Sequence, residues 1–180
     1  MKKVTWAIIV GVVLILIFIV AAFFYLALAS PSNQKQELLN PTFGVSLNEV
    51  VIEEQHVSYV LNEIGAYKLH NMPLTGEKPI IEVKIEDEVF NCEISSGKIK
   101  TTKGNGDSPD LRIISTRQEI MNALNSSNIK ESVKNSVVSG EIDLEIVGGY
   151  TTLFQKGYLS LYQDLTGKSI SGGVIKIFEG

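Results

Sequence analysis

An uninterrupted apolar segment, Val4–Ala29, lies near the start of the sequence and contains no charged residue. A bilayer core about 30 Å thick takes roughly 20 apolar residues as a helix, so this segment is long enough to span one. Trp6 and Tyr25 lie near its two ends, where amphipathic rings favour the membrane interfaces. The pattern predicts a transmembrane anchor over residues 1–30. A cleaved signal peptide is the alternative, although the apolar core of such a peptide has only about 7–15 residues.

The charges that flank this segment predict its orientation. Lys2 and Lys3 precede it, whereas only Lys35 follows closely. Because positive charge is retained on the cytoplasmic side, we expect a single-pass membrane protein with a cytoplasmic amino terminus and a soluble domain outside. Residues 31–42 are polar and predict a stalk, which leads to a soluble domain over residues 43–180.

The middle of the chain alternates between apolar and polar residues with a period of two. This alternation is typical of strands with one buried and one solvated face. It predicts strands over residues 81–86, 89–94, 98–102 and 141–147, and the more apolar run 111–114 predicts a further strand. The first three are joined by short connections, which favour an antiparallel sheet. Cys92 has the inward parity, so we expect a buried, structural thiol.

Helical spacing of apolar residues accounts for most of the remaining chain. Helices are expected over 47–64, where Ser46 and Glu49 form a capping box, over 117–125, over 129–139 and over 150–165. Gly157 lies inside the last of these and suggests close packing against a neighbour. Tyr67–Leu69 could form a short strand, and Val174–Phe178 either an edge strand or a loose tail.

Charge excludes one class of partner. Residues 31–180 hold all 20 acidic residues and all but two of the 16 basic ones, which gives this part a net charge of −6. Nucleic-acid binding needs a basic surface, so we expect no nucleic-acid partner. Cys92 is the only cysteine, which excludes a disulfide within one chain.

The order of these elements resembles the sterol carrier protein type-two (SCP2) domain. A strand begins with an aspartate before an apolar run (Asp110–Ile114), and a helix follows over Arg117–Leu124. A second helix ends in Ser139-Gly140 before the strand Glu141–Val147, and the helix Tyr150–Leu165 comes last. The resemblance covers about half of the chain. It implies an α+β fold with a curved antiparallel sheet covered by helices, here preceded by one transmembrane helix, and an apolar tunnel that takes lipids.

The helix expected over Tyr150–Leu165 has the most pronounced apolar stripe of the soluble part. Such a stripe either packs against the sheet as core or, in part, lines a pocket, and both interpretations stay open. Tyrosine combines an apolar ring with a hydroxyl that needs a partner, which suits a lipid cavity with a polar mouth. The ligand-binding residues predicted here and on the helix before are Met121, Leu124, Tyr150, Phe154, Tyr158, Leu161 and Tyr162.

No catalytic or metal-binding pattern stands out. His56 and His70 are the only histidines, and neither has a carboxylate at metal-ligand spacing. Gly167-Lys168-Ser169 lacks the earlier glycine of a phosphate loop, because that position is Tyr162. We therefore expect no enzyme, no cofactor and no metal.

Two functions fit these patterns. The first is a membrane-anchored, extracytoplasmic domain that binds an apolar ligand such as a lipid. The second is a non-catalytic structural or interaction subunit of a membrane or cell-surface assembly. The partners expected are the lipid bilayer, an apolar small molecule or lipid, and other membrane proteins.

Overall fold

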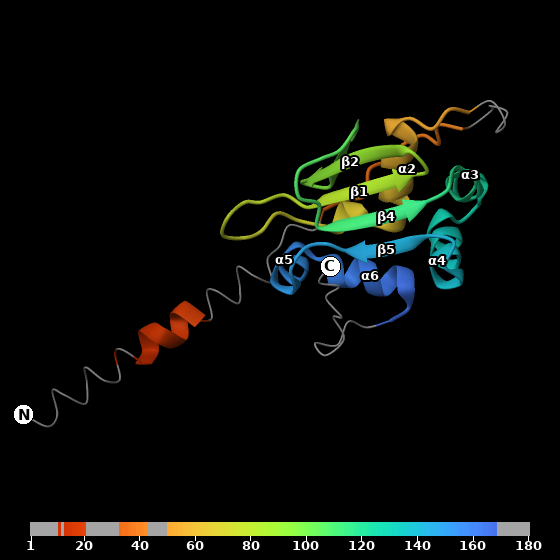
Figure 1. Ribbon diagram of the computed structural model, residues 1–180. Coiled ribbons are helices and arrows are strands. Elements are labelled where there is room, and N and C mark those ends of the chain that lie inside the picture. Colours follow the sequence, from red (N-terminus) through yellow and green to blue (C-terminus); the bar gives the residue numbers. More distant parts are fainter. Residues whose placement is uncertain (1–10, 12, 21–32, 43–49, 169–180) are drawn as a thin grey trace, which may run out of the picture. The chain divides into compact units, whose positions relative to one another are not determined.

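The computed structural model describes residues 11, 13–20, 33–42 and 50–168. The chain divides into two compact units, Met1–Ser32 and Asn33–Gly180. The second unit contains all the labelled strands and helices of Figure 1. The helix start expected at Ser46 and the strand expected at Val174–Phe178 lie outside the described residues.

The structure contradicts the predicted membrane location. Within the described ranges, no helix is long and apolar enough to cross a membrane. The prediction of a single-pass protein with a cytoplasmic amino terminus and an external domain is therefore wrong. The other residues of the expected anchor, 1–10, 12 and 21–30, lie outside the described residues.

The second unit has the predicted α+β class, with a five-stranded sheet. Its strands are β1 (Ile80–Ile85), β2 (Glu88–Ser95), β3 (Lys98–Lys103), β4 (Leu111–Ser115) and β5 (Asp143–Ile146). They lie in the order β3-β2-β1-β4-β5.

One strand pairing corrects the prediction of an antiparallel sheet. β1 and β4 are parallel, with Val83 opposite Ile113, while the other neighbours are antiparallel. A parallel neighbour needs a crossover, because the chain must return to the end from which the first strand started. The β2–β3 hairpin and the loop that follows it provide this return.

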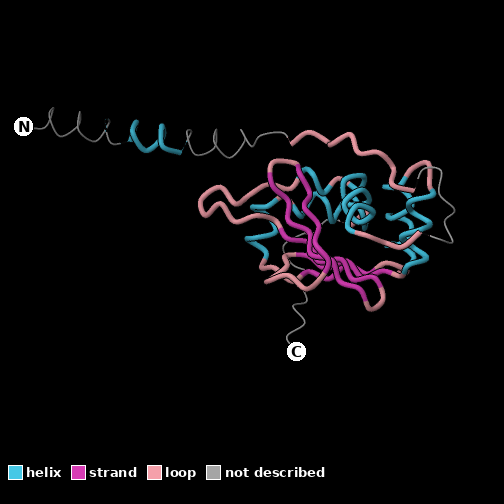
Figure 2. The backbone as a smooth tube through the Cα atoms, turned by 90° about the horizontal axis from the view of Figure 1, so that it is seen from above, coloured by secondary structure: helices cyan, strands magenta, loops and turns pink. Residues whose placement is uncertain are grey.

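The inward parity predicted for the strands is confirmed. Phe90, Cys92 and Ile94 of β2 are fully buried, and the inward apolar residues of β1 and β4 are at most 5 % exposed. The helices gather over this face, and Figure 2 shows strands and helices as two layers. Burial raises the pKa of the Cys92 thiol to about 12, so the thiol stays protonated and unreactive.

The first described helix of the second unit begins later than predicted. Helix α2 spans Glu54–Ile64, and a 3₁₀ turn, η1, spans Ala66–Lys68 where a strand was expected. Its capping box joins Glu53 and His56, with the Glu53 amide donating to His56 Nδ1 at 3.0 Å. The expected box at Ser46 and Glu49 lies in residues that the structure does not describe.

The next two helices are confirmed. Helix α3 spans Arg117–Asn125 behind the N-cap Thr116, and α4 spans Ile129–Ser139 behind Asn128. Each N-cap side chain accepts a hydrogen bond from a backbone amide three residues later, which satisfies a helix end that has no internal partner.

The last predicted helix is two helices. α5 spans Tyr150–Lys156 and α6 spans Tyr158–Thr166. Gly157 lies between them with φ +86°, a left-handed conformation that ends a helix and that glycine adopts without strain. The glycine predicted to allow close packing therefore changes the direction of the chain.

Residues 33–42, expected as a polar stalk, lie against the rest of the second unit. Asn33 donates to the Leu69 carbonyl at 2.7 Å, and the side chain of the fully buried Asn62 donates to the Gln36 carbonyl at 2.9 Å. Asn40 donates to the Leu124 carbonyl at 3.2 Å. These bonds connect the segment to η1, α2 and α3.

Candidate functional site: a charged pocket at one end of the sheet

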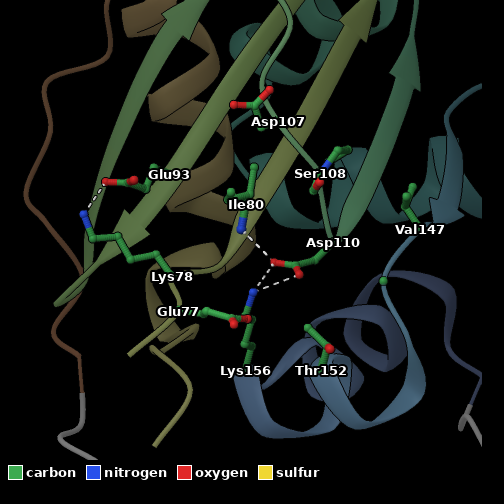
Figure 3. A pocket seen from close by; sticks show the side chains of 12 residues that line it. Glu77, Lys78, Ile80, Glu93, Asp107, Ser108, Asp110, Val147, Thr152 and Lys156 are labelled. Carbon is green, nitrogen blue, oxygen red and sulfur yellow. Dashed lines mark hydrogen bonds and ion pairs between the residues drawn. The ribbon is translucent and has the colours of Figure 1, made fainter. Parts of the chain in front are cut away.

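A pocket of about 640 Å³ lies where β1 and β4 begin and β5 ends. Parallel strands start at the same edge of a sheet, and β5 runs the opposite way, so three segments of the chain meet there. Figure 3 shows the pocket between the loop before β1, the loop before β4 and helix α5.

Asp110 is the centre of this site. The residue is 5 % exposed and precedes β4. Its carboxylate accepts hydrogen bonds from the Ile80 amide at 2.8 Å and from Lys156 Nζ at 2.9 Å. Its carbonyl also accepts the amides of Val147 and Gly148, so one residue fixes the ends of three strands. A buried carboxylate is stable only when it is paired in this way.

Lys156 provides the charge that balances Asp110. It stands in the last turn of α5 and is only 4 % exposed. Its amine lies 2.9 Å from one Asp110 carboxylate oxygen and 3.1 Å from the other, as Figure 3 shows. The ion pair thus attaches α5 to the edge of the sheet and forms the inner wall of the pocket.

Tyr158 completes the polar cluster from the first turn of α6. Its hydroxyl lies 3.0 Å from Asp110 Oδ2 and 3.1 Å from the Ile80 carbonyl. Burial, and after it the negative charge of Asp110, raises the pKa of Tyr158 well above its ordinary value. The hydroxyl therefore stays protonated and acts as a hydrogen-bond donor.

The mouth of the pocket is acidic. Its lining includes four carboxylates and two lysines, an excess of two negative charges. Lys78 is paired with Glu93 at 2.8 Å, and Lys156 is paired with Asp110. The carboxylates of Glu77 and Asp107 have no ion-pair partner among the described residues.

The pocket also has apolar walls. Ile80, Pro109 and Val147 contribute to its lining, and Val147 is 47 % exposed. The site can therefore accept an organic group beside a charge. No cluster of three or more His, Cys, Asp or Glu side chains suited to a metal ion occurs in the part of the chain that the structure describes.

The residues predicted to bind a ligand do not lie together. Met121, Leu124, Tyr158 and Leu161 are buried in the core, Tyr150 and Phe154 are exposed, and Tyr162 is half-buried. None of them lines this pocket or a smaller one of about 340 Å³ beside Arg117. Tyr158 alone touches the charged cluster, through its hydroxyl, and the apolar ligand site on these residues stays a prediction.

Sequence reasoning missed the pair of Asp110 and Lys156. The sequence pattern places Asp110 at the start of a strand and Lys156 inside a helix, and it does not pair them. One signal is present in the sequence: Lys156 lies three residues after Leu153, a member of the apolar stripe, so helical spacing places the lysine on the buried side of the helix. A lysine at such a position needs an acidic partner.

The site therefore belongs to an α+β domain with a polar, acid-rimmed pocket at one edge of its sheet. No protein-family model matches the chain, and no curated protein matches it. Among solved structures, the ubiquinone synthesis protein UbiJ-SCP2 is similar at 10 % identity and a TM-score of 0.32, over 46 % of this chain and 67 % of that one.

A second similar structure is the stereoselective inverting sec-alkylsulfatase Pisa1 from Pseudomonas sp. It shows 11 % identity and a TM-score of 0.40 over 73 % of this chain. A double mutant of that sulfatase gives 13 % identity and a TM-score of 0.38 over 67 % of this chain. The matched part is only 18 % and 17 % of the sulfatase chains. Scores this low assign no family.

Proposed function

We propose that the second unit is a non-catalytic binding module for a small amphipathic ligand that carries a positive charge. The observation that carries this proposal is the pocket itself, in which the carboxylates of Glu77 and Asp107 stand near the apolar residues Ile80, Pro109 and Val147. The ligand's cationic group lies at the acidic mouth, and its apolar part lies against the wall. The proposed ligand therefore keeps the apolar part that the sequence predicts and has a positive charge in addition.

The inner groups of the pocket support binding over catalysis. The Lys156 amine is within hydrogen-bond distance of both oxygens of Asp110, and the raised pKa of Tyr158 keeps its hydroxyl protonated. A general base or a nucleophile needs a free lone pair near neutral pH. Lys156 and Tyr158 instead act as fixed donors that hold the pocket in shape.

Electrostatics supports a cationic ligand. The two lysines of the lining are already paired, so the excess negative charge is left at Glu77 and Asp107. Both residues are exposed, so each contributes modestly, about 0.2–1 kcal/mol for a surface ion pair. The expected affinity is accordingly weak, with specificity for charge sign as the main signature.

The test compares three ligands that share a phenyl ring. Saturation-transfer NMR on the full chain measures binding of 2-phenylethylamine, a cation, 2-phenylethanol, which is neutral, and 3-phenylpropionate, an anion. We expect the amine to bind best and the anion worst. The double variant Glu77→Gln/Asp107→Asn should remove the preference for the amine, because it removes the unpaired charges.

A charge-matched control separates the pocket from the overall acidity of the chain. Glu37→Gln/Asp87→Asn also removes two carboxylates, neither of which lines this pocket. The control should keep the preference for the amine. Equal losses in both double variants, or equal binding of amine and anion to the wild type, would refute the proposal.

A second candidate function, an interaction subunit, is favoured by one observation. Tyr150 and Phe154 are 43 % and 65 % exposed and stand four residues apart on α5, so they share one helix face. Sedimentation velocity of the full chain and of Tyr150→Ser/Phe154→Ser tests whether this face supports self-association. If the wild type and the variant have the same sedimentation coefficient at every concentration, this candidate is removed.

A further inference from the structure

The connection between β3 and β4 crosses the face of the sheet that lies opposite the helices. β2 and β1 lie between these two strands in the sheet, so residues 104–110 must pass both of them. Phe90 and Cys92 of β2 are on the buried face under the helices, and Asn91 between them therefore points to the other face. A Cβ added at Gly106 would overlap the Asn91 carboxamide, so the connection lies directly on that side chain.

The sheet leaves the Asn91 side chain little freedom beneath this contact. Glu82 and Thr102 lie opposite Asn91 on the two neighbouring strands and flank it on both sides. Asn91 Oδ1 is buried and has no hydrogen-bond partner among the described residues. Because a buried acceptor normally has a partner, the arrangement does not serve the hydrogen bonding of Asn91. It instead forms a surface on which the chain can lie closely only where it has no side chain.

The backbone of the connection also has an unusual conformation. Ser108 has φ +45°, in the left-handed region that non-glycine residues rarely adopt. The other described non-glycine residues with positive φ, Glu86 and Ser96, stand in two-residue hairpin turns, which favour such values. Ser108 is not part of a hairpin. A conformation of this kind persists only where the surrounding structure imposes it, and such residues gather at functional sites.

Backbone hydrogen bonds fix only the two ends of the connection. At one end the Gly104 amide donates to the Val89 carbonyl at 2.7 Å, and at the other the Asp110 amide donates to a carbonyl of β1 at 2.9 Å. Residues 105–109 form no backbone–backbone hydrogen bond with any other described residue. The position of this middle part therefore depends on its packing against the sheet.

The middle part forms one wall of the pocket. Asp107, Ser108 and Pro109 line it, and Figure 3 shows Asp107 and Ser108 on the segment that leads to Asp110. Asp107 directly follows Gly106. A shift of the glycine away from the sheet would therefore move one of the two carboxylates that meet the proposed ligand at the mouth.

We propose that Gly106 and Asn91 are positioning residues for the pocket. Their contact fixes the height of the connection above the sheet and holds Asp107 at the mouth, where its charge contributes to the preference for a cationic ligand. Neither Gly106 nor Asn91 lines the pocket, so both act through Asp107. The role of Asp107 rests on the proposed function, whereas the position of the connection does not depend on a ligand.

Three variants of the full chain test the effect on binding. Gly106→Ala places a methyl group against Asn91, and Gly106→Ala/Asn91→Ala removes the obstructing carboxamide. Gly149→Ala is the matched control, because Gly149 has φ −65° and an added Cβ would project into open space. Saturation-transfer NMR compares 2-phenylethylamine with 3-phenylpropionate. We expect the preference for the amine to fall about 1.4- to 5-fold in Gly106→Ala, the equivalent of one surface ion pair, and to be retained in the double variant and in the control.

Hydrogen exchange examines the connection without a ligand. The Gly104 and Asp110 amides, which hold its two ends, should exchange at least about fivefold faster in Gly106→Ala and near the wild-type rate in the double variant. Unchanged exchange in Gly106→Ala, faster exchange with an unchanged preference for the amine, or a loss that the double variant does not restore would each overturn the proposal. If the wild type itself shows no preference for the amine, the proposed function fails, and exchange still decides whether this contact fixes the connection.

Discussion

At the residue scale, the domain depends on one buried ion pair. Asp110 and Lys156 are 5 % and 4 % exposed, and they connect the ends of three strands to the end of α5. Burial of two charges costs desolvation free energy that their attraction only partly returns, so such a pair matters most when one partner is lost. The pair therefore specifies where α5 attaches more than it adds net stability.

Replacement of Lys156 by methionine tests this view. Lys156→Met leaves the Asp110 carboxylate buried without its cation, so the free energy of unfolding should fall by about 3–5 kcal/mol. The double variant Asp110→Asn/Lys156→Met should lose less than the sum of the two single changes, since neither charge remains. Urea denaturation measures each value. Lys134→Met, at a half-exposed surface position, is the control. The prediction is contradicted if Lys156→Met lowers the free energy of unfolding by no more than this control does.

His56 makes the stability of α2 depend on pH. Burial lowers the pKa of His56, although Glu53 acts in the opposite direction, and the neutral ring accepts the Glu53 amide. The unfolded chain binds a proton near pH 6.5 and the folded chain only at lower pH. The unfolded state then holds more protons, so the free energy of unfolding falls as pH decreases below about 6.5, until the folded-state pKa is reached.

The variant His56→Gln isolates this effect. Glutamine keeps an acceptor at the third position of the capping box but does not titrate. Urea denaturation between pH 8 and pH 5.5 should show a decrease in the wild type and a smaller decrease in the variant. Equal pH dependence of the two proteins would show that His56 does not cause the decrease.

At the element scale, the break between α5 and α6 shows how one glycine redirects an amphipathic pattern. The apolar stripe continues across Gly157, yet its φ of +86° ends the first helix. A Cβ added there would meet the His70 ring at 3.5 Å, an ordinary contact, so space does not require the glycine. The requirement is the left-handed backbone conformation.

Substitution at Gly157 should therefore follow backbone preference. Gly157→Ala places a side chain in the left-handed region and should lower the free energy of unfolding by about 1–2 kcal/mol. Gly157→Asn should cost less, because asparagine tolerates this conformation. Thermal unfolding of both variants measures the difference. Asparagine at least as costly as alanine would indicate that packing, and not the backbone, decides this position.

The same scale shows what the sequence could predict. Period-two and helical spacing predicted all five strands and placed α3 and α4 correctly, because these patterns depend on residues that are close in the chain. The parallel pairing of β1 with β4 depends on contacts between residues about 30 positions apart, such as Ile81 and Leu111, and local patterns do not encode it. The start of α2 was not predicted because its capping box is unusual. His56 stands where such a box normally has a glutamate.

The candidate site was harder to predict than the fold. Its residues come from the loops before β1 and β4, from the end of β5 and from α5, so no motif joins them in sequence. The ligand-binding site was predicted on the aromatic stripe because aromatic residues suit both a core and a lipid pocket. In the folded chain Tyr158 and Leu161 are core residues, whereas Phe154 is exposed.

At the scale of the whole second unit, residues 33–42 connect elements that are far apart in sequence. Their three hydrogen bonds reach Leu69, Asn62 and Leu124, and Lys35 adds an ion pair with Glu63 at 2.6 Å. A polar stalk would leave these groups to water. Asn62 is fully buried, so without the Gln36 carbonyl its amide would lack this partner in the interior, and an unsatisfied buried group costs about 1–3 kcal/mol.

Two truncated chains decide whether this segment is part of the fold. A chain of residues 43–180 should unfold at lower urea concentration than one of residues 33–180, with a loss of about 2–4 kcal/mol for three hydrogen bonds of roughly 1 kcal/mol each and the exposed amide. In the longer chain, Asn62→Leu removes only the bond to the Gln36 carbonyl and should lower the free energy of unfolding by less than the truncation does, because the bonds of Asn33 and Asn40 remain. Equal stability of the two truncated chains would show that the segment only leads to the domain, as a stalk does. A loss of the expected size would show that the domain begins at Asn33, and that its fold includes ten residues whose polar composition resembles a linker.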